Sequence, residues 1–314
     1  MREFLHGTAW ENAKISPIAG DASARRYARL ASPNAILMVD PEGDTQKFAD
    51  IAAILQDANL CAPQIHAHDL ALGTMIISDL GPTDFAKHLE QNPTEEPSLY
   101  QAATDILAQL HHISDQPDLP RMTHEKAADM IDLASLHYAE NPEGEAALRA
   151  ASLTAYEKLV APDLHLCLRD FHAENLIWRP DLTGSDRVGL LDFQDACMAP
   201  IGYDLMSFIR DARRDVDDGV AQAVTKQFCA SIGTNAQAMS AHLACVGAQR
   251  NLRILGIFAR LAKSGKPQYL GLIPRVWRHL LSDLSHPALI DLKAAALRYL
   301  PEPNAQTLSR LENA

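Results

Sequence analysis

The chain has 314 residues, 47% of them hydrophobic and 22% charged, which is long enough for about two domains and ordinary for a folded globular protein. Its net charge of −12 argues against a general nucleic-acid-binding protein, because such a protein needs a basic face to displace counterions. The five cysteines lack a CxxC pair, the amino terminus lacks a signal-peptide pattern, and no apolar run has membrane-spanning length, so we expect a cytoplasmic protein with neither nucleic acid nor membrane as a partner.

The first eighty residues predict a small mixed α/β region. Four segments have the alternation or the short apolar runs that are typical of strands. These predicted strands are Arg26–Leu30, Ala35–Val39, Gln64–His68 and Thr74–Ser78. Between the second and the third, residues Asp44–Asn59 have the apolar spacing of an amphipathic helix, with Asp44 as its N-cap. Gly81 and Pro82 interrupt the pattern, so we place a lobe boundary after residue 80.

Residues 81–314 predict a larger, mainly helical lobe. The segments with apolar residues three and four apart are Tyr100–Ile113, His124–Tyr138, Glu145–Val160, Tyr203–Arg213, Gly219–Ser231, Ala236–Lys263 and Pro274–Ser285. One segment among them lacks the helical spacing of apolar residues. It contains two short apolar runs, Leu176–Trp178 and Val188–Leu191, separated by a turn-rich stretch. We therefore expect a β-hairpin inserted into the helical lobe.

Polar side chains stand at both ends of this expected hairpin. Asn175 directly precedes the first strand and Asp192 follows the second, so antiparallel pairing would bring these two residues together. Two oxygen ligands at one point suit Mg²⁺, which usually takes one or two protein ligands together with water and substrate phosphates. Asp170, slightly upstream, could orient an attacking hydroxyl and accept its proton. The spacing thus predicts a magnesium-dependent phosphotransferase with Asp170 as the catalytic base and Asn175 and Asp192 as metal ligands.

The same D-x-x-x-x-N … D pattern marks the catalytic loop and the metal aspartate of protein kinases. Arg169 precedes Asp170 as in that signature, whereas Leu168 and Gln194 stand where the signature has His and Gly. The stretch Leu168–Asn175 also resembles the Brenner motif of the aminoglycoside phosphotransferase family.

Further segments resemble one branch of that family, the bacterial N-acetylmuramate/N-acetylglucosamine anomeric kinases. They are similar to its nucleotide loop, catalytic loop, metal motif and carboxy-terminal helices, in the right order along nearly the whole chain. In the same order, these segments are Gly20–Arg29, Arg169–Leu176, Asp192–Ala196, Gln249–Leu261 and Ile273–Trp277.

The resemblance implies a two-lobed, protein-kinase-like α+β fold. It implies a small β-rich N-terminal lobe with one helix, residues 1–80, that binds the nucleotide, and a helical C-terminal lobe, residues 81–314, with the catalytic loop and the substrate site. It also implies transfer of the ATP γ-phosphate to the anomeric hydroxyl of an amino sugar in cell-wall (peptidoglycan) recycling. The nucleotide-binding residues that we expect are Gly20, Ser23, Arg26, Ile77, Asp79 and Leu80, the last three in the inter-lobe hinge that pairs with adenine.

One cation of the kinase pattern is missing. Protein kinases hold the α- and β-phosphates with a lysine on the third strand, and the corresponding run Ala35–Val39 contains none. We favour Arg26 as its replacement. Arg29, on the opposite face of the same strand by alternation, and Lys47 on the following helix are alternatives, and each of these charges could equally be solvated.

Several polar residues near the motifs allow two interpretations. His172, Gln194 and Asp195 are candidate substrate-binding residues, although His172 could instead stabilise the catalytic loop and Asp195 could satisfy local backbone groups. Asp204 is expected to cap a helix or brace the catalytic loop. A row of arginines on one helix could face a cleft or the solvent. It consists of Arg250, Arg253 and Arg260.

Two alternatives to the amino-sugar kinase remain open on the sequence. The first is a phosphotransferase for another small alcohol, such as choline, a homoserine or an aminoglycoside. A cationic aminoglycoside would require an acidic acceptor site, which the net charge permits without locating it. The second is an inactive, nucleotide-binding protein with a kinase-like shape. The missing strand lysine favours it, and the presence of Asp170, Asn175 and Asp192 argues against it.

Overall fold

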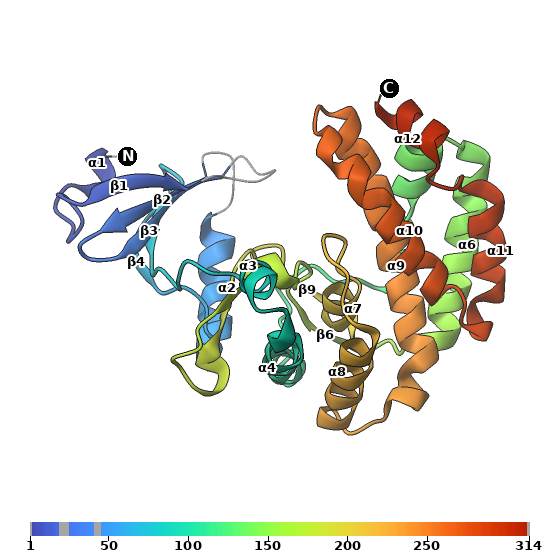
Figure 1. Cartoon of the computed structure of the whole chain (residues 1–314), viewed down its shortest axis with the longest axis horizontal. Coiled ribbons are helices and arrows are strands. Elements are labelled where there is room, and N and C mark those ends of the chain that lie inside the picture. The colour runs from blue at the N-terminus through green and yellow to red at the C-terminus, as the bar shows by residue number, and fades with distance from the viewer. Residues whose placement is uncertain (1, 19–24, 41–44, 313–314) are drawn as a thin grey trace. The chain divides into compact units, whose positions relative to one another are not determined.

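The computed structural model describes residues 2–18, 25–40 and 45–312. The expected nucleotide-loop residues Gly20 and Ser23 and the predicted N-cap Asp44 lie outside the described residues. The chain divides into two compact units, whose elements are drawn in Figure 1. The first unit comprises residues 1–106 and 173–195, and the second comprises residues 107–172 and 196–314.

A five-stranded antiparallel sheet with the order β1-β2-β3-β5-β4 organises the first unit. Its strands are β1 (Lys14–Ile18), β2 (Arg26–Ala31), β3 (Ala35–Val39), β4 (Ile65–Asp69) and β5 (Thr74–Ile77). All four predicted strands are confirmed. The edge strand β1 was not predicted, because its side chains are mostly exposed and show no alternation. Pro17 is tolerated there, since an edge strand does not need every backbone donor.

The helices of the first unit are α1 (Arg2–Leu5), α2 (Thr45–Asp57), α3 (Phe85–Gln91) and most of α4 (Glu96–His111). The predicted helix is confirmed as α2, which buries Phe48, Ile51 and Leu55. The short helix α3 was not predicted. Its N-cap is Asp84, whose side chain accepts the backbone N–H of Lys87 at 2.8 Å.

The predicted hairpin is confirmed as β7 (Leu176–Trp178) and β8 (Val188–Leu190), and it belongs to the first unit. Two backbone hydrogen bonds fix it there. Trp178 N–H donates to the carbonyl of Thr83 at 3.0 Å, and Leu190 N–H donates to the carbonyl of Cys61 at 2.8 Å. The first unit is therefore larger than the expected lobe of residues 1–80, whose role as the nucleotide-binding lobe stays a prediction.

The second unit is mainly helical. Besides the last turn of α4, its helices are α5 (His124–Asp129), α6 (Pro142–Leu159), α7 (Tyr203–Ile209), α8 (Asp218–Ser231), α9 (Ala236–Lys263), α10 (Ile273–Asp283), α11 (Ile290–Tyr299) and α12 (Ala305–Glu312). A two-stranded ribbon, β6 (Leu164–Cys167) and β9 (Cys197–Pro200), completes it. The long helix α9 runs beside α10 (Figure 1) and has the predicted bounds. None of the helices in the described ranges is long and apolar enough to cross a membrane.

One predicted helix is interrupted. The expected helix His124–Tyr138 ends as α5 at Asp129, and the chain continues as a π-helical segment, Ala134–Ala139. The interruption lies against α9, where a Cβ on Gly256 would come within 2.2 Å of the carbonyl carbon of Leu133. The two backbones approach so closely that only glycine fits there. Periodicity alone does not report such a packing requirement.

Candidate active site

The expected catalytic base, Asp170, lies in the second unit, in the loop that follows β6 and that we call the catalytic loop. The backbone just before it is held by one buried side chain at the start of α7. The carboxylate of Asp204 accepts the N–H of Leu168 at 2.6 Å and the N–H of Arg169 at 2.9 Å. It also accepts the thiol of Cys167 at 3.0 Å. The predicted bracing role of Asp204 is thereby confirmed.

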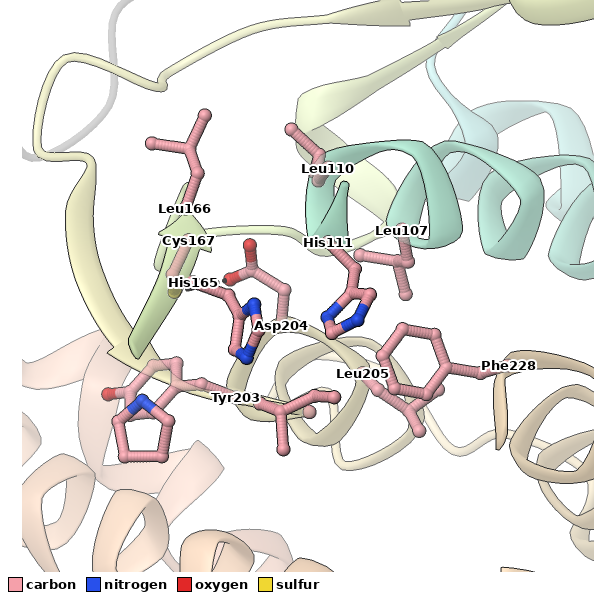
Figure 2. A pocket seen from close by; sticks show the side chains of 13 residues that line it. Leu107, Leu110, His111, His165, Leu166, Cys167, Tyr203, Asp204, Leu205 and Phe228 are labelled. Carbon is pink, nitrogen blue, oxygen red and sulfur yellow. Dashed lines mark hydrogen bonds between the residues drawn. The ribbon is translucent and has the colours of Figure 1, made fainter. Parts of the chain in front are cut away.

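Figure 2 shows the side chain of Asp204, the second residue of α7, near Cys167 of β6 and at the edge of a small cavity where His111 faces His165. Burial raises the pKa of Asp204 to about 6, although the hydrogen bonds from Cys167, Leu168 and Arg169 favour the charged form. The cavity has a volume of about 20 Å³, which is room for about one water molecule. It is therefore too small to receive a sugar or an amino alcohol.

A second support reaches the loop from α7 and α9. The hydroxyl of Ser207 donates to the carbonyl of Arg169 at 3.2 Å, and it accepts from Nη2 of Arg250 at 2.8 Å. Arg250 is 6% exposed, so this member of the arginine row is buried, whereas Arg260 is exposed. Arg169 itself has a left-handed backbone, with φ of 71°. Such strain in a non-glycine residue persists only where the surrounding structure imposes it.

The end of the loop packs against α7 and the segment that follows this helix. The ring of Phe171 meets the ring of Phe208 edge to face, with centroids 5.4 Å apart. The Nη1 of Arg213 lies 3.3 Å from Nε2 of the buried His172. Burial, and then the charges of Arg213 and Arg250, hold the pKa of His172 well below its ordinary value, so its ring is neutral and can accept this hydrogen bond. The burial favours the loop-stabilising interpretation, and substrate binding by His172 stays a prediction.

The expected metal ligands lie in the first unit, at the ends of the hairpin. Leu191 N–H donates to the carbonyl of Asn175 at 3.0 Å, which extends the pairing of β7 and β8 by one residue, and Asp192 follows Leu191 directly in the chain. The roles of Asn175 and Asp192 as metal ligands stay predictions. Asp192 also has a left-handed backbone, with φ of 57°, and its carboxylate is half-exposed. Gln194 Nε2 donates to Oδ1 of Asp192 at 2.9 Å. The following Asp195 is exposed.

This donor set fits Mg²⁺ better than a metal held by protein alone. A carboxylate and an amide oxygen leave most coordination positions for water and phosphate oxygens, which is the usual arrangement around Mg²⁺. Within the part of the chain that the structure describes, no group of three or more His, Cys, Asp or Glu side chains could hold a metal ion. A metal at Asn175 and Asp192 would thus depend on the substrate for several ligands.

The structure reveals a cation that the sequence analysis did not consider. Arg25, one residue before β2, donates from Nε to Asp40 Oδ2 at 2.5 Å, and both side chains are largely buried. Its Nη1 lies 3.9 Å from Oδ1 of Asp192. The strand register places Arg26 opposite Val39, so Arg25 falls opposite Asp40. The predicted turn between β2 and β3 determines this register, so it was the sequence signal that could have placed Arg25 opposite Asp40.

The other expected nucleotide-binding residues have different surroundings. Arg26 is exposed, and Arg29 is paired through Nε with Asp79 at 2.6 Å. Ile77 is buried in β5, and Leu80 packs against Ile177 of the hairpin. The residues Ser78 to Leu80 border a hollow of about 520 Å³ in the first unit. The adenine-binding role of this segment stays a prediction.

Comparison with known proteins identifies the class. Residues 14–242 match the model of the phosphotransferase enzyme family APH. The chain is 33% identical to an N-acetylmuramate/N-acetylglucosamine kinase of Caulobacter vibrioides, over 95% of each chain. This chain therefore belongs to the APH phosphotransferase family of enzymes, and the family resemblance seen in the sequence is confirmed.

Solved structures agree on the fold. A choline/ethanolamine kinase family protein from Mesorhizobium loti is 14% identical, with a TM-score of 0.65 over 94% of this chain and 97% of that chain. A spectinomycin phosphotransferase in complex with ADP and spectinomycin is also 14% identical, with a TM-score of 0.56 over 96% and 93% of the two chains. The predicted kinase-like α+β fold is confirmed.

Proposed function

We propose that this enzyme transfers the γ-phosphate of ATP to the anomeric hydroxyl of an amino sugar, N-acetylmuramate or N-acetylglucosamine, in cell-wall recycling. The observation that supports it most is the hydrogen bond from Leu191 N–H to the carbonyl of Asn175, which places Asn175 across the hairpin from the residue before Asp192. The relative from Caulobacter vibrioides is named for these two sugars, and the spectinomycin phosphotransferase was solved with ADP.

In the proposed reaction, Asp170 accepts the proton of the acceptor hydroxyl. The hydroxyl oxygen forms a bond to the γ-phosphorus while the bond from that phosphorus to the β-phosphate oxygen breaks, and ADP leaves. An anomeric hydroxyl is a comparatively acidic alcohol, so a positioned carboxylate is a sufficient base. Asn175 and Asp192 would hold Mg²⁺, which when bound neutralises phosphate charge. The hydrogen bonds that Asp204 accepts from the N–H groups of Leu168 and Arg169 hold the backbone that precedes the base.

We further propose Arg25 as the phosphate-binding cation in place of the strand lysine. Its Nε is fixed by Asp40, and its Nη1 lies near the carboxylate of Asp192. A planar guanidinium can bind phosphate oxygens through two parallel hydrogen bonds. Arg26 remains the second candidate, because it is exposed but lies on the adjoining strand.

A coupled ADP-release assay tests the proposal. The acceptors are N-acetylmuramate, N-acetylglucosamine, choline, homoserine and an aminoglycoside, each with ATP and Mg²⁺. We expect turnover with the two sugars, with loss of the reducing end as the anomeric carbon is phosphorylated. Asp170→Asn should reduce kcat about a hundredfold or more, and the exposed hairpin-loop variant Asp181→Asn is the matched control.

Each other outcome identifies a different error. Turnover with choline, homoserine or an aminoglycoside alone would replace the acceptor and keep the reaction class. Absence of turnover with every acceptor would favour the inactive, nucleotide-binding protein. Unchanged turnover in Asp170→Asn would remove Asp170 as the base.

A further inference from the structure

Two of the five cysteines, Cys167 and Cys197, lie directly opposite each other in the second unit. Cys167 is the last residue of β6 and Cys197 is the first residue of β9, and the two strands pair antiparallel. Residues that face each other across such a pair have Cα atoms about 4.5–5.5 Å apart, with side chains on the same face. Disulfides span Cα distances of about 4.4–6.8 Å. The register therefore gives these two cysteines the spacing that a disulfide requires.

The two cysteines enclose the segment that carries the expected chemistry. Residues 168–196 lie between them in the sequence, and these residues include Asp170, Asn175 and Asp192. On the amino-terminal side, only Leu168 and Arg169 separate Cys167 from Asp170. A covalent bond between the cysteines would therefore form next to the catalytic loop.

The thiol of Cys197 has surroundings that favour its reactive, ionised form. A hydrogen bond from the thiol of Cys167 is the largest influence on the pKa of Cys197 and lowers it, and the positive charges of Arg169 and Arg253 lower it further against burial. Burial raises the pKa of Cys167 instead, as it does for Cys229 of α8. The thiolate is the form of cysteine that attacks an oxidant. Cys197 is therefore the cysteine of the pair that reacts first.

The thiol of Cys167 has a structural role that a disulfide would end. It donates to Oδ1 of Asp204 at 3.0 Å, and the same oxygen accepts the N–H of Arg169 at 2.9 Å. A sulfur in a disulfide carries no proton, so Asp204 would lose this donor. The loss of a donor makes the ionised form of a buried carboxylate less stable. Since Asp204 holds the backbone just before Asp170, the change would disturb the position of the expected base.

The burial of the pair selects the kind of oxidant. Cys167 is 3% exposed and Cys197 is 5% exposed. The cavity in Figure 2, which has room for about one water molecule, is lined in part by Cys167. Its lining includes His165, which lies two positions before Cys167 and so on the same face of β6. Such a space favours a small oxidant such as hydrogen peroxide over a bulky disulfide or a protein.

We propose that Cys167 and Cys197 are a reversible oxidation site, at which hydrogen peroxide forms a disulfide that lowers the turnover of the enzyme. In the first step the Cys197 thiolate attacks one oxygen of the peroxide, and the O–O bond breaks. The hydroxide that leaves takes up the proton of the thiol, so one water and a sulfenic acid result. In the second step the sulfur of Cys167 attacks the sulfur of the sulfenic acid. The S–O bond breaks, and a second water leaves with the proton of Cys167.

Mass spectrometry and turnover of the peroxide-treated enzyme test the proposal. After treatment, the protein is unfolded in urea, its remaining thiols are blocked with iodoacetamide, and it is digested with a protease. We expect two peptides joined through Cys167 and Cys197. In the coupled ADP-release assay, kcat should fall about tenfold or more with the acceptor that the untreated enzyme phosphorylates best. Dithiothreitol should restore it by thiol–disulfide exchange.

Three variants assign the effect to the pair. Cys197→Ala cannot form the disulfide and keeps the bond from Cys167 to Asp204, so it should retain its turnover after peroxide treatment. Cys167→Ser keeps a hydroxyl donor for Asp204 and should accumulate a sulfenic acid at Cys197, which dimedone labels. Cys229→Ala, the matched control, removes another buried cysteine and should lose turnover with peroxide as the wild type does.

The contrary results overturn the proposal. Iodoacetamide on both Cys167 and Cys197 after treatment would show that the pair does not oxidise. A joined pair with unchanged kcat would show that the disulfide does not regulate turnover. Equal losses of turnover in Cys197→Ala and the wild type would assign the effect to another residue. The joined peptides are detected without an acceptor, so absence of turnover with the two sugars would contradict the proposed function alone.

Discussion

Replacing Asp204 with asparagine tests how one buried carboxylate shapes the catalytic loop. Asp204 accepts the N–H of Leu168 through Oδ2 and the N–H of Arg169 through Oδ1. Asparagine keeps the size and one oxygen, but its amide nitrogen would point N–H donors at one of these backbone donors. One buried N–H would then lack an acceptor, which costs about 1–3 kcal/mol.

The raised pKa of Asp204 gives an opposing contribution. Burial raises this pKa from 3.8 to about 6, against the hydrogen bonds that favour the carboxylate. The pKa of this carboxyl group is higher in the folded state than in the unfolded state. The protonated group therefore stabilises the folded protein fully below the unfolded pKa of 3.8, and that stability is lost as the pH rises through about 6. Above that pH the ionised group therefore costs about 3 kcal/mol relative to a neutral one. At pH 5 the wild type regains about 1 kcal/mol of this stability.

Urea unfolding at pH 5 and pH 7.5 measures both effects. We expect Asp204→Asn and the wild type to differ little at pH 7.5, because the lost hydrogen bond and the removed buried charge nearly cancel. At pH 5 the free energy of unfolding of the wild type should increase by about 1 kcal/mol relative to that of the variant. The kcat should fall about tenfold to a hundredfold in the variant, because Asp170 is displaced.

Asp218→Asn, which removes an exposed carboxylate of α8, is the charge-matched control. If the difference in unfolding free energy between Asp204→Asn and the wild type were the same at both pH values, the raised pKa would be wrong. If kcat were unchanged, the hydrogen bonds of Asp204 would not position the base.

Three further perturbations test the nucleotide side and the packing. Arg25→Gln should raise KM for ATP about tenfold or more with a smaller change in the KM of the sugar, and an unchanged KM for ATP would return the role to another cation. Chelation with EDTA should abolish turnover, excess Mg²⁺ should restore it, and Asp192→Asn should require a higher Mg²⁺ concentration; turnover in EDTA would exclude the metal. Gly256→Ala should lower the free energy of unfolding by about 1–3 kcal/mol, because the new Cβ would lie 2.2 Å from the carbonyl carbon of Leu133, whereas Gly271→Ala meets nothing within 4 Å; equal effects in urea unfolding would contradict the close approach.

The hairpin and its two oxygen side chains could be predicted because the signal is local. Turn residues between two apolar runs specify the pairing, and pairing determines which residues lie at the ends. The unit to which the hairpin belongs was not predictable in this way. That depends on hydrogen bonds from Trp178 and Leu190 to carbonyls at Thr83 and Cys61, about one hundred or more positions away in the sequence. No periodicity within the hairpin reports those partners.

The two arginines of the proposed site show a second limit. Arg25 and Arg26 are adjacent and chemically identical, so composition cannot choose between them. The register of β2 with β3 decides, because it places Arg25 opposite Asp40 and leaves Arg26 exposed. Likewise, spacing on α9 could not distinguish the buried Arg250 from the exposed Arg260. Burial of an arginine depends on which partner is within reach, such as the hydroxyl of Ser207.

The net charge of −12 therefore says little about the charge of the substrates. Asp40 accepts a hydrogen bond from the side chain of Arg25 in the first unit, and Asp211 accepts one from the backbone N–H of Arg213 in the second. Each of these carboxylates lowers the contribution of a neighbouring arginine to the electrostatic field at long range. Binding of a phosphate depends instead on the hydrogen-bond donors and charges within a few ångströms of it. The charge of a substrate must therefore be inferred from the residues around its site and not from the net charge of the chain.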